Sequence, residues 1–303
     1  MRAGIALFLC AACTNEESIN LPHGDLLVEG VCSTYETRPY FTSAGDDLYW
    51  ISPCDETIRS ASKQDGSSRV FAANEPLAAM LAVDDTYLYW TRSSSLAAGE
   101  IVRAPRAGGV PVVIATAQDQ MYGALPQQLV VDETTLYRSK MSEILAMPKD
   151  GTAEPGVIAT GTGGPFLAVD SEYIYWANMH SVHRQRKGSS TDEELAHVES
   201  AIFDPIAYTE HAVFYWWQSH LYKIEKETGG PAKMVLEGAP HGRAFVSDGI
   251  EFLYWQSGTT LVRTSEDGIV SPIVQLVERA DAIAIDDQRI YWIESEKISS
   301  SPR

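Results

Sequence analysis

Basic residues are scarce in this chain of 303 residues. Lys and Arg number 23 against 41 Asp and Glu, which leaves a formal net charge of −18. A surface that binds nucleic acid or anionic lipid needs clustered cations, so this balance argues against both as the main partner. The apolar fraction of 45% and the charged fraction of 21% are ordinary for a globular chain and exclude wholesale disorder. A chain of this length can bury roughly 75% of its unfolded surface.

Several catalytic signatures are also missing. The sequence has no P-loop, no dinucleotide fingerprint, no Gly-x-Ser-x-Gly elbow, no calcium-binding loop and no HExxH motif. It therefore gives no indication of a cofactor or a metal. No segment repeats its apolar residues with a 3.6-residue period over three turns, which favours an all-β protein.

Long apolar runs are absent as well. The run from Ala3 to Ala12 is far short of the ~20 residues that cross a membrane as a helix. One cation, a short apolar core and small residues before Cys13 are typical of a secretory signal. The stretch 9–13 (LCAAC) is similar to a bacterial lipobox, with Cys10 in the place usually held by Leu. We expect either lipidation of Cys13 or ordinary secretion.

This interpretation divides the chain into a signal at 1–13, a short polar tether at 14–24 and a single domain at 25–303. The mature protein would sit in the cell envelope on a lipid anchor, facing the periplasm or the surface, or would otherwise be secreted. Export favours a disulfide between the remaining cysteines, Cys32 and Cys54. The bridge would close a loop of about 22 residues and add roughly 3 kcal/mol of stability. Two free buried thiols are the alternative.

One phrase recurs seven times: an apolar strand, an Asp, a short polar turn and then aromatic residues ending in Tyr-Trp. Its final positions are Trp50, Trp90, Arg138, Trp176, Tyr215, Trp255 and Trp292. The steps between them are 40, 48, 38, 39, 40 and 37 residues, and five of the chain's seven tryptophans occupy this position. Between phrases come a strand, a turn such as KDG, EDG or TGG, and a further strand. Each repeat therefore predicts four strands.

Four-stranded units repeated in this way close radially into a β-propeller, because one unit cannot bury both of its faces alone. The last repeat lacks its fourth strand, while residues 25–30 (DLLVEG) form a strand without a preceding partner. We therefore predict an all-β, seven-bladed β-propeller with four-stranded blades. Residues 25–30 would complete the last blade and leave no open edge.

The phrase resembles the YWTD class of propeller repeat. The closest copy is GGPFLAVD at 163–170, followed by Tyr175 and Trp176. The similarity extends over 25–303 and includes bacterial propeller lipoproteins built from such repeats. The Thr-Asp that follows Tyr-Trp in the class is mostly replaced here, for example by Ala177-Asn178. The resemblance implies a propeller fold and leaves the function open.

The repeated aspartates open the turn between the first two strands of their repeats; they are Asp84, Asp132, Asp170 and Asp286. An Asp in such a turn accepts hydrogen bonds from backbone N–H groups, and its recurrence favours this structural role over a chemical one. The Tyr-Trp pairs are expected to fill the space between blades.

Functional residues are expected where the repeats differ, on the face that carries the loops before each first strand and between second and third strands. Six of the seven histidines lie between 180 and 241. The first hypothesis is a binding mouth, in which aromatic residues stack on a sugar or peptide and a cation holds an acidic group. Its residues would be Tyr122, Trp217, His220, His241, Arg243 and Asp281, with Glu75, Gln127, Asn178 and His180 as further polar candidates.

A metal or acid–base site is the second hypothesis, in which His220 and His241 act beside Asp204 or Asp281 as a zinc or general-base set. Solvated surface histidines are the plainer explanation. The alternation of His180 and His183 on a strand is weak evidence for a site, and the basic run 183–187 is typical of a solvated strand face. The innermost strands are apolar where a lactonase-type propeller would need Asn and Asp ligands, which argues against that class.

These observations predict an exported, ligand- or protein-binding or scaffolding propeller, monomeric, with an unknown protein, peptide or glycan as its ligand and no assigned chemistry. The alternative is a propeller hydrolase or lyase with a His/Asp site on the same face. A purely structural envelope protein is a third explanation that no sequence feature opposes.

Overall fold

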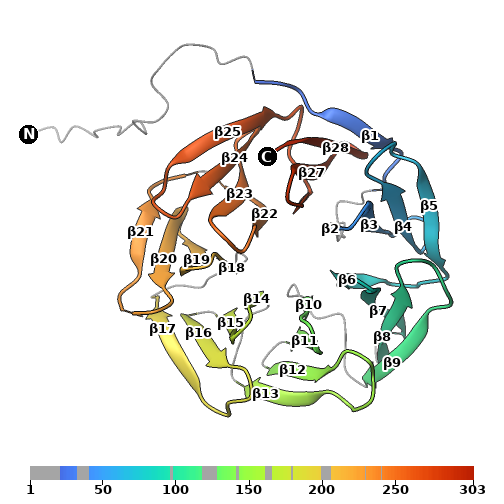
Figure 1. Ribbon diagram of the computed structural model, residues 1–303, viewed down its shortest axis with the longest axis horizontal. Coiled ribbons are helices and arrows are strands. Elements are labelled where there is room, and N and C mark those ends of the chain that lie inside the picture. Colours follow the sequence, from blue (N-terminus) through green and yellow to red (C-terminus); the bar gives the residue numbers. More distant parts are fainter. Residues whose placement is uncertain are drawn as a thin grey trace, which may run out of the picture.

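The computed structural model describes residues 21–32, 41–95, 98–117, 128–140, 143–160, 166–178, 180–198, 206–228, 230–239 and 241–303. Within these ranges the chain forms 28 strands. No described segment is a helix long and apolar enough to cross a membrane. The strands make seven antiparallel sheets of four strands each, here called blades I to VII, arranged in a ring (Figure 1). The predicted seven-bladed propeller is confirmed.

The blades follow one another along the chain, and each runs from an innermost first strand to an outermost fourth strand (Figure 1). Blade I contains β2 (Phe41–Ala44), β3 (Asp47–Ser52), β4 (Thr57–Ser62) and β5 (Ser68–Ala73). Blade II contains β6 (Ala79–Val83), β7 (Tyr87–Ser95), β8 (Ala98–Pro105) and β9 (Val112–Ala117). Blade III contains β10 (Leu129–Val131), β11 (Thr135–Lys140), β12 (Glu143–Pro148) and β13 (Gly156–Thr160).

The second half of the ring repeats the pattern. Blade IV contains β14 (Phe166–Val169), β15 (Tyr173–Ala177), β16 (Ser181–Arg186) and β17 (Asp192–His197). Blade V contains β18 (Ile206–Tyr208), β19 (Ala212–Trp217), β20 (His220–Glu225) and β21 (Lys233–Leu236). Blade VI contains β22 (His241–Ser247), β23 (Phe252–Ser257), β24 (Thr260–Ser265) and β25 (Val270–Gln275). Blade VII contains β26 (Ala282–Ile285), β27 (Arg289–Glu294), β28 (Lys297–Pro302) and β1 (Asp25–Glu29).

The two ends of the domain close the ring in blade VII. Strand β1 pairs antiparallel with β28, and Val28 lies opposite Ile298 in the register. The predicted closing strand is therefore confirmed. Just beyond it, Val31 N–H donates to the carbonyl of Glu296 at 2.8 Å. The predicted disulfide between Cys32 and Cys54 then joins this segment to the turn between β3 and β4 of blade I.

The Tyr-Trp pairs form the core between blades, as expected. Successive residues of a strand point to opposite faces of the sheet. The Trp of each phrase packs against the preceding blade, where it joins a buried or partly buried cross-strand pair from the third and fourth strands. These sets are Trp50 with Ile298 and Val28, Trp90 with Ile58 and Ala72, Trp176 with Ile144 and Ala159, Trp255 with Leu221 and Leu236, and Trp292 with Leu261 and Val274.

The tyrosine that comes one residue before the final position of a phrase faces the following blade. Tyr49 packs in the cluster of Trp90, and Tyr137 packs in the cluster of Trp176. Burial raises the pKa of Tyr137 to about 12, so the phenol stays neutral at physiological pH. Every junction between blades therefore buries aromatic side chains from one or both sides.

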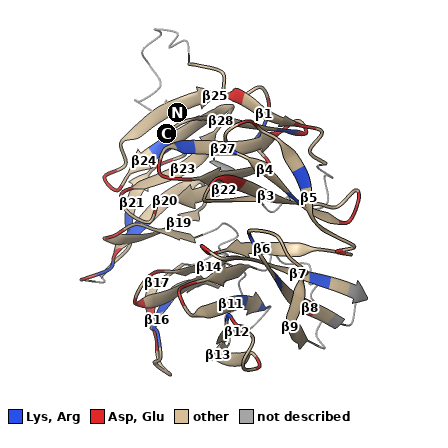
Figure 2. Ribbon diagram, turned by 45° about the vertical axis from the view of Figure 1, so that its right-hand side comes forward, with Lys and Arg blue, Asp and Glu red and all other residues tan. Residues whose placement is uncertain are grey.

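The repeated aspartates cap their turns, as predicted. In blade II, Asp84 Oδ1 accepts from the backbone N–H groups of Thr86 and Tyr87, at 2.8 and 2.6 Å. Its Oδ2 accepts from the Tyr89 hydroxyl at 2.9 Å. The same pattern recurs at Asp132, Asp170 and Asp286. Acidic residues are seen in turns at the strand ends (Figure 2).

These four aspartates, and Asp248 in the corresponding turn of blade VI, also join the blades. A cation from the end of the third strand in the next blade reaches back to the same carboxylate. The pairs are Lys149–Asp84 (2.8 Å), Lys187–Asp132 (2.7 Å), Lys226–Asp170 (2.6 Å), Arg303–Asp248 (3.0 Å) and Lys63–Asp286 (2.8 Å). At the two remaining junctions Arg106 donates to the carbonyl of Ala44 at 2.6 Å, and Thr209 donates to Glu266. All seven junctions therefore have an ion pair or hydrogen bond on the face of the ring that carries the turns between first and second strands.

Candidate ligand-binding cleft between blades IV and V

Blade V lacks the Trp that fills most junctions. Tyr215 holds that position and lies in the buried cluster between blades IV and V, beside Val182 and close to Ala196. These two residues are the cross-strand pair of β16 and β17 that would flank an indole ring. A phenol is smaller than an indole, and a cleft of about 560 Å³ opens at this junction. Its walls are Glu194, Leu195, Ala196, His197 and Val198 from blade IV, and Tyr215, Trp217, Tyr222, Gly230, Pro231 and Ala232 from blade V.

Three aromatic rings form the blade V wall of the cleft. Tyr215 and Tyr222 are opposite each other in the register of β19 and β20, and their rings stack with centroids 5.4 Å apart. Trp217 lies two residues beyond Tyr215 and therefore on the same face of the sheet. Its ring is 5.8 Å from that of Tyr222 at an angle of 56°. Burial raises the pKa of Tyr215 to about 12, so this phenol is uncharged at physiological pH.

A tight turn holds the aromatic wall in place. Gln218 and Ser219 both have positive φ, at 50° and 63°, as a two-residue hairpin turn between twisted strands requires. His220 Nδ1 lies 2.6 Å from the carbonyl oxygen of Gln218 and must carry the proton, since a carbonyl can only accept. The His220 ring is 6.3 Å from the Tyr222 ring. The predicted residues Trp217 and His220 are thus brought together at one strand end.

The other predicted site residues are more scattered. Asp281 precedes β26 in blade VII, is exposed, and its N–H donates to Ile293 O at 2.8 Å. Partial burial raises the pKa of Asp281, aided by Glu278 and opposed by Arg279. Tyr122, Gln127 and Asp204 lie outside the described residues, as do the side chains of His241 and Arg243. The grouping of His220, His241 and Asp204 stays a prediction.

Glu75 has a structural environment. Its side chain is 1% exposed and accepts from Trp90 Nε1 at 2.6 Å and from Arg92 Nη1 at 3.1 Å. It therefore completes the hydrogen bonding of a buried indole. Asn178 Oδ1 accepts from the backbone N–H groups of His180 and Ser181, at 2.8 and 2.7 Å, and so shapes the turn into β16.

A hydrogen-bonded chain in blade IV was not anticipated from the sequence. Ser181 Oγ lies 2.7 Å from His183 Nε2, and His183 Nδ1 lies 2.8 Å from Asp192 Oδ2. The His183 ring also stacks on Trp176 at 5.4 Å and 3°. The Ser181 hydroxyl donates to Asn178 Oδ1 at 2.9 Å, which fixes one end of the chain. The available signal was the spacing of Ser181 and His183, two residues apart on one strand face, with an acid on the next strand.

Metal ligands do not gather in the described part of the chain. No three His, Cys, Asp or Glu side chains there lie close enough together to hold one ion.

Comparisons with known proteins find the fold and no family. No protein-family model matches the chain, and no curated protein sequence matches it. The solved virginiamycin B lyase from Staphylococcus aureus is 13% identical, with a TM-score of 0.69 over 91% of this chain and 98% of that one. BamB from Moraxella catarrhalis is 8% identical, with a TM-score of 0.54 over 87% and 96%. A chain of a nidogen/laminin complex is 18% identical, with a TM-score of 0.51 over 70% and 86%.

At these identities the similarity shows the β-propeller architecture alone. The solved structures similar to this chain include a lyase and BamB, and at 13% and 8% identity neither carries a function over to this chain. The function has to be argued from the side chains of this chain.

Proposed function

We propose that this protein is an exported binding propeller that recognises a protein partner through the cleft between blades IV and V. The observation that carries the proposal is the aromatic wall of Tyr215, Trp217 and Tyr222 along a cleft of about 560 Å³. Large aromatic residues in preformed pockets are typical energetic centres of protein interfaces, because they bury much area at little cost in conformational entropy.

The rim of the cleft suits a protein ligand. Leu195, Pro231 and Ala232 continue the apolar surface beyond the aromatic wall. Glu194 and His197 stand at the edge with side chains 49% and 68% exposed, and they lie 3.4 Å apart. An apolar centre with a polar, solvated edge is the usual anatomy of a protein interface. An apolar or aromatic side chain of the partner would enter the cleft, and a peptide or a glycan would use the same aromatic wall.

The test compares partner recovery by three forms of the full chain. Immobilised wild type, Trp217→Ala and Ile250→Ala are incubated with envelope extract of the source cells, and bound proteins are identified. Ile250 is 62% exposed and lies in a turn of blade VI, so it controls for loss of any exposed apolar side chain. We expect one partner bound directly by wild type and Ile250→Ala and at least tenfold weaker by Trp217→Ala. Equal binding by Trp217→Ala would overturn the proposal, as would a glycan that alone occupies the cleft.

Export and lipid anchoring belong to the same proposal. The Cys32–Cys54 disulfide supports export, because disulfides persist in oxidising compartments. Anchoring is attributed to Cys13, which lies outside the described residues. We expect Cys13→Ser to release the protein from the membrane fraction, whereas Cys10→Ser leaves it there. Soluble wild-type protein would contradict the anchor.

A hydrolase is the second candidate, and the chain Ser181–His183–Asp192 favours it. In that function the Ser181 hydroxyl would turn from Asn178 to His183, and Ser181 Oγ would attack a carbonyl carbon while His183 Nε2 takes its proton and Asp192 orients the imidazole. His183 would pass that proton to the leaving group as the bond to it breaks, and water would then hydrolyse the acyl-serine ester. Treatment with a fluorophosphonate probe is the direct test. Labelling of Ser181 that disappears in Ser181→Ala and falls in His183→Ala would support it, and no labelling of the wild type would dismiss it.

A further inference from the structure

Blade III carries a cation in the position where five blades carry Trp. Arg138 pairs with Leu129 on one side and Leu145 on the other, as Trp90 pairs with Leu81 and Val102 in blade II. The strand register is therefore equivalent. Arg138 is 4% exposed, so the guanidinium stem is buried in the junction between blades II and III.

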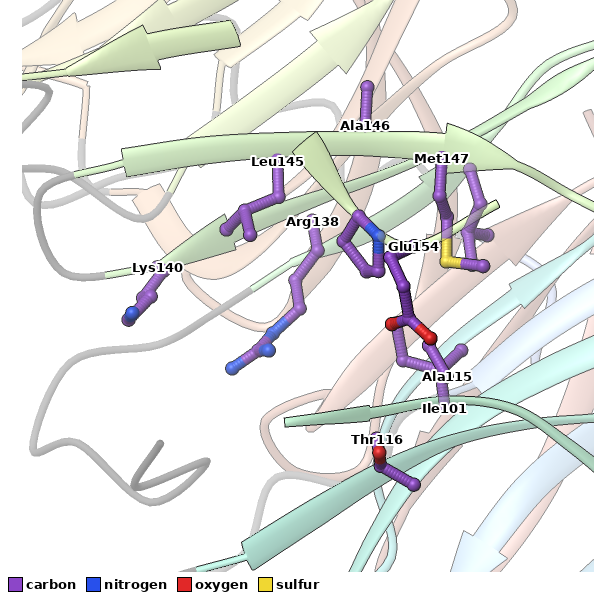
Figure 3. Close-up of a pocket in the computed structure, with 11 residues that line it drawn as sticks. Ile101, Ala115, Thr116, Arg138, Lys140, Leu145, Ala146, Met147 and Glu154 are labelled. Atoms are coloured by element: carbon purple, nitrogen blue, oxygen red, sulfur yellow. The ribbon is translucent and has the colours of Figure 1, made fainter. Parts of the chain in front are cut away.

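A cavity of about 280 Å³ lies at this junction (Figure 3). Blade II lines it with Ile101, Ala115 and Thr116. Blade III lines it with Leu136, Arg138, Lys140, Leu145, Ala146, Met147, Glu154 and Pro155. Most of this surface is aliphatic. Figure 3 shows Arg138 and Lys140 on one side and the Glu154 side chain near Ala115 and Ile101 on the other.

The internal repeat shows what this cavity is shaped to hold. Ile101 pairs across the strands with Ala115, as Ile144 pairs with Ala159 one blade later. The Ile144 and Ala159 pair packs in the cluster of Trp176. At the corresponding place the Ile101 and Ala115 pair faces the cavity. The space between blades II and III therefore corresponds to the space that an indole ring of the chain occupies at five other junctions.

We propose that this cavity is a binding site for a small planar aromatic molecule of indole size, stacked on the guanidinium of Arg138. A cavity of about 150 Å³ lined by aliphatic residues is sufficient for benzene, so one of this size has room for a bicyclic ring. Arg is the cation best suited to stacking, because its guanidinium is planar and weakly hydrated. Stacking uses the face of the group and leaves its N–H edges to their own hydrogen bonds.

The chemistry differs from that of the cleft between blades IV and V. There the wall is aromatic, and the proposed occupant is a side chain of a protein. Here the walls are mostly aliphatic, with the guanidinium of Arg138 on one side, and the proposed occupant is a free aromatic molecule. The two sites lie at different junctions, so each can fail without the other.

Calorimetric titration of the full chain with indole tests the proposal. Three variants accompany the wild type. Arg138→Trp fills the cavity with the chain's own indole, Ala115→Leu narrows it from the opposite wall, and Arg138→Met keeps an unbranched side chain without the cation. We expect saturable binding by wild type, no binding by Arg138→Trp or Ala115→Leu, and binding weakened about 3- to 30-fold by Arg138→Met.

Trp176→Ala in the next junction is the positive control, because removal of that indole should create a site that indole restores. No binding by wild type, while Trp176→Ala gains it, would overturn the proposal. Unchanged binding by both filling variants would place the ligand elsewhere and would also overturn it. Equal affinity of Arg138→Met would overturn the role of the guanidinium. If Arg138→Trp fails to fold, Ala115→Leu carries the same test.

Discussion

Lys63 Nζ lies 2.8 Å from Asp286 Oδ2, although the two residues are 223 positions apart in the chain. The pair joins blade I to blade VII by the same kind of ion pair that joins Lys149 of blade III to Asp84 of blade II. On the face that carries the turns between first and second strands, the closing junction is thus chemically like the others. At the outer rim the closing blade differs from the others, because its fourth strand, β1, comes from the other end of the chain and pairs with β28.

Acid should open this closing pair. Burial acts to raise the pKa of Asp286, but hydrogen bonds from the Lys63 ammonium, two backbone N–H groups and the Tyr291 hydroxyl outweigh it and hold the pKa at about 2. The folded value lies below the ordinary 3.8. The stabilisation is therefore fully present above about pH 4 and is lost as the pH falls toward 2. Denaturation by urea at several pH values measures it.

Asp286→Asn should lower the free energy of unfolding by about 1–2 kcal/mol at pH 7. At pH 2 the difference from wild type should shrink to a small part of its value at pH 7, because about half of the wild-type carboxylate is then protonated in the folded protein. Asp287→Asn is the control, since it removes an exposed acid from the same turn. A difference for Asp286→Asn that is as large at pH 2 as at pH 7 would contradict this account of the pair.

Gly66 is predicted to be irreplaceable for a reason beyond its backbone conformation. It lies in the turn between β4 and β5 with φ of +70°, and a Cβ there would stand 2.0 Å from the carbonyl oxygen of Leu27 in the closing strand. Gly188 occupies the equivalent turn of blade IV with φ of +78° and has open space around it. Gly66→Ala should therefore cost more than Gly188→Ala.

The two substitutions share the strain of a positive φ, roughly 1 kcal/mol each. Gly66→Ala adds a collision with backbone, worth about 1–3 kcal/mol more. Midpoints of urea unfolding for both variants give the difference. Equal losses of stability would mean that β1 moves away from the turn without cost.

The architecture can be predicted from the sequence because each blade has its own local sequence pattern. Each Tyr-Trp phrase marks one blade, so counting phrases counts blades, and the unpaired strand at 25–30 identifies the closure. The capping role of Asp84 also follows from its own turn, whose N–H groups lie two and three residues away.

The contacts between blades were harder to foresee. The Lys149 partner of Asp84 lies 65 residues away in another blade, and no local pattern assigns it. Arg138 and Tyr215 were visible as departures from the repeat, yet the cavities beside them depend on side chains of the preceding blade. The contact of His183 with Asp192 also depends on a register shift between β16 and β17, which one sequence does not reveal.

Trp90 and Trp50 are equivalent in the repeat but differ in hydrogen bonding. Trp90 Nε1 donates to Glu75 at 2.6 Å, whereas Trp50 Nε1 has no partner within the described part of the chain. Both rings are almost completely buried. Trp90→Phe should cost about 1–3 kcal/mol more than Trp50→Phe, because it leaves a buried carboxylate short of a donor. The measurement is the free energy of unfolding of each variant.

A further variant separates volume from hydrogen bonding in this prediction. Trp90→Phe combined with Glu75→Gln replaces the buried charge with a neutral amide. The coupling between the two substitutions should recover part of the loss, as a double-mutant cycle would show. Strict additivity would mean that the Trp90–Glu75 contact contributes little beyond packing.

The Cys32–Cys54 disulfide is predicted to hold the same closing junction as Lys63 and Asp286. It fastens the segment after β1 to the turn between β3 and β4, and the two cysteines are 22 positions apart in the chain. In the chain-entropy model a loop of this size contributes roughly 3 kcal/mol. Reductant should therefore lower the Tm of wild type by several degrees and leave a Cys32→Ser, Cys54→Ser double variant unchanged.

Both the disulfide and the ion pair restrain blade I against blade VII, so their losses should not simply add. With the disulfide reduced, β1 can separate from the ring more easily, and the junction then depends more strongly on Lys63 and Asp286. Asp286→Asn should therefore cost more stability in the reduced protein than in the oxidised one. An equal loss of stability in both states would show that the disulfide and the Lys63–Asp286 pair restrain the junction independently.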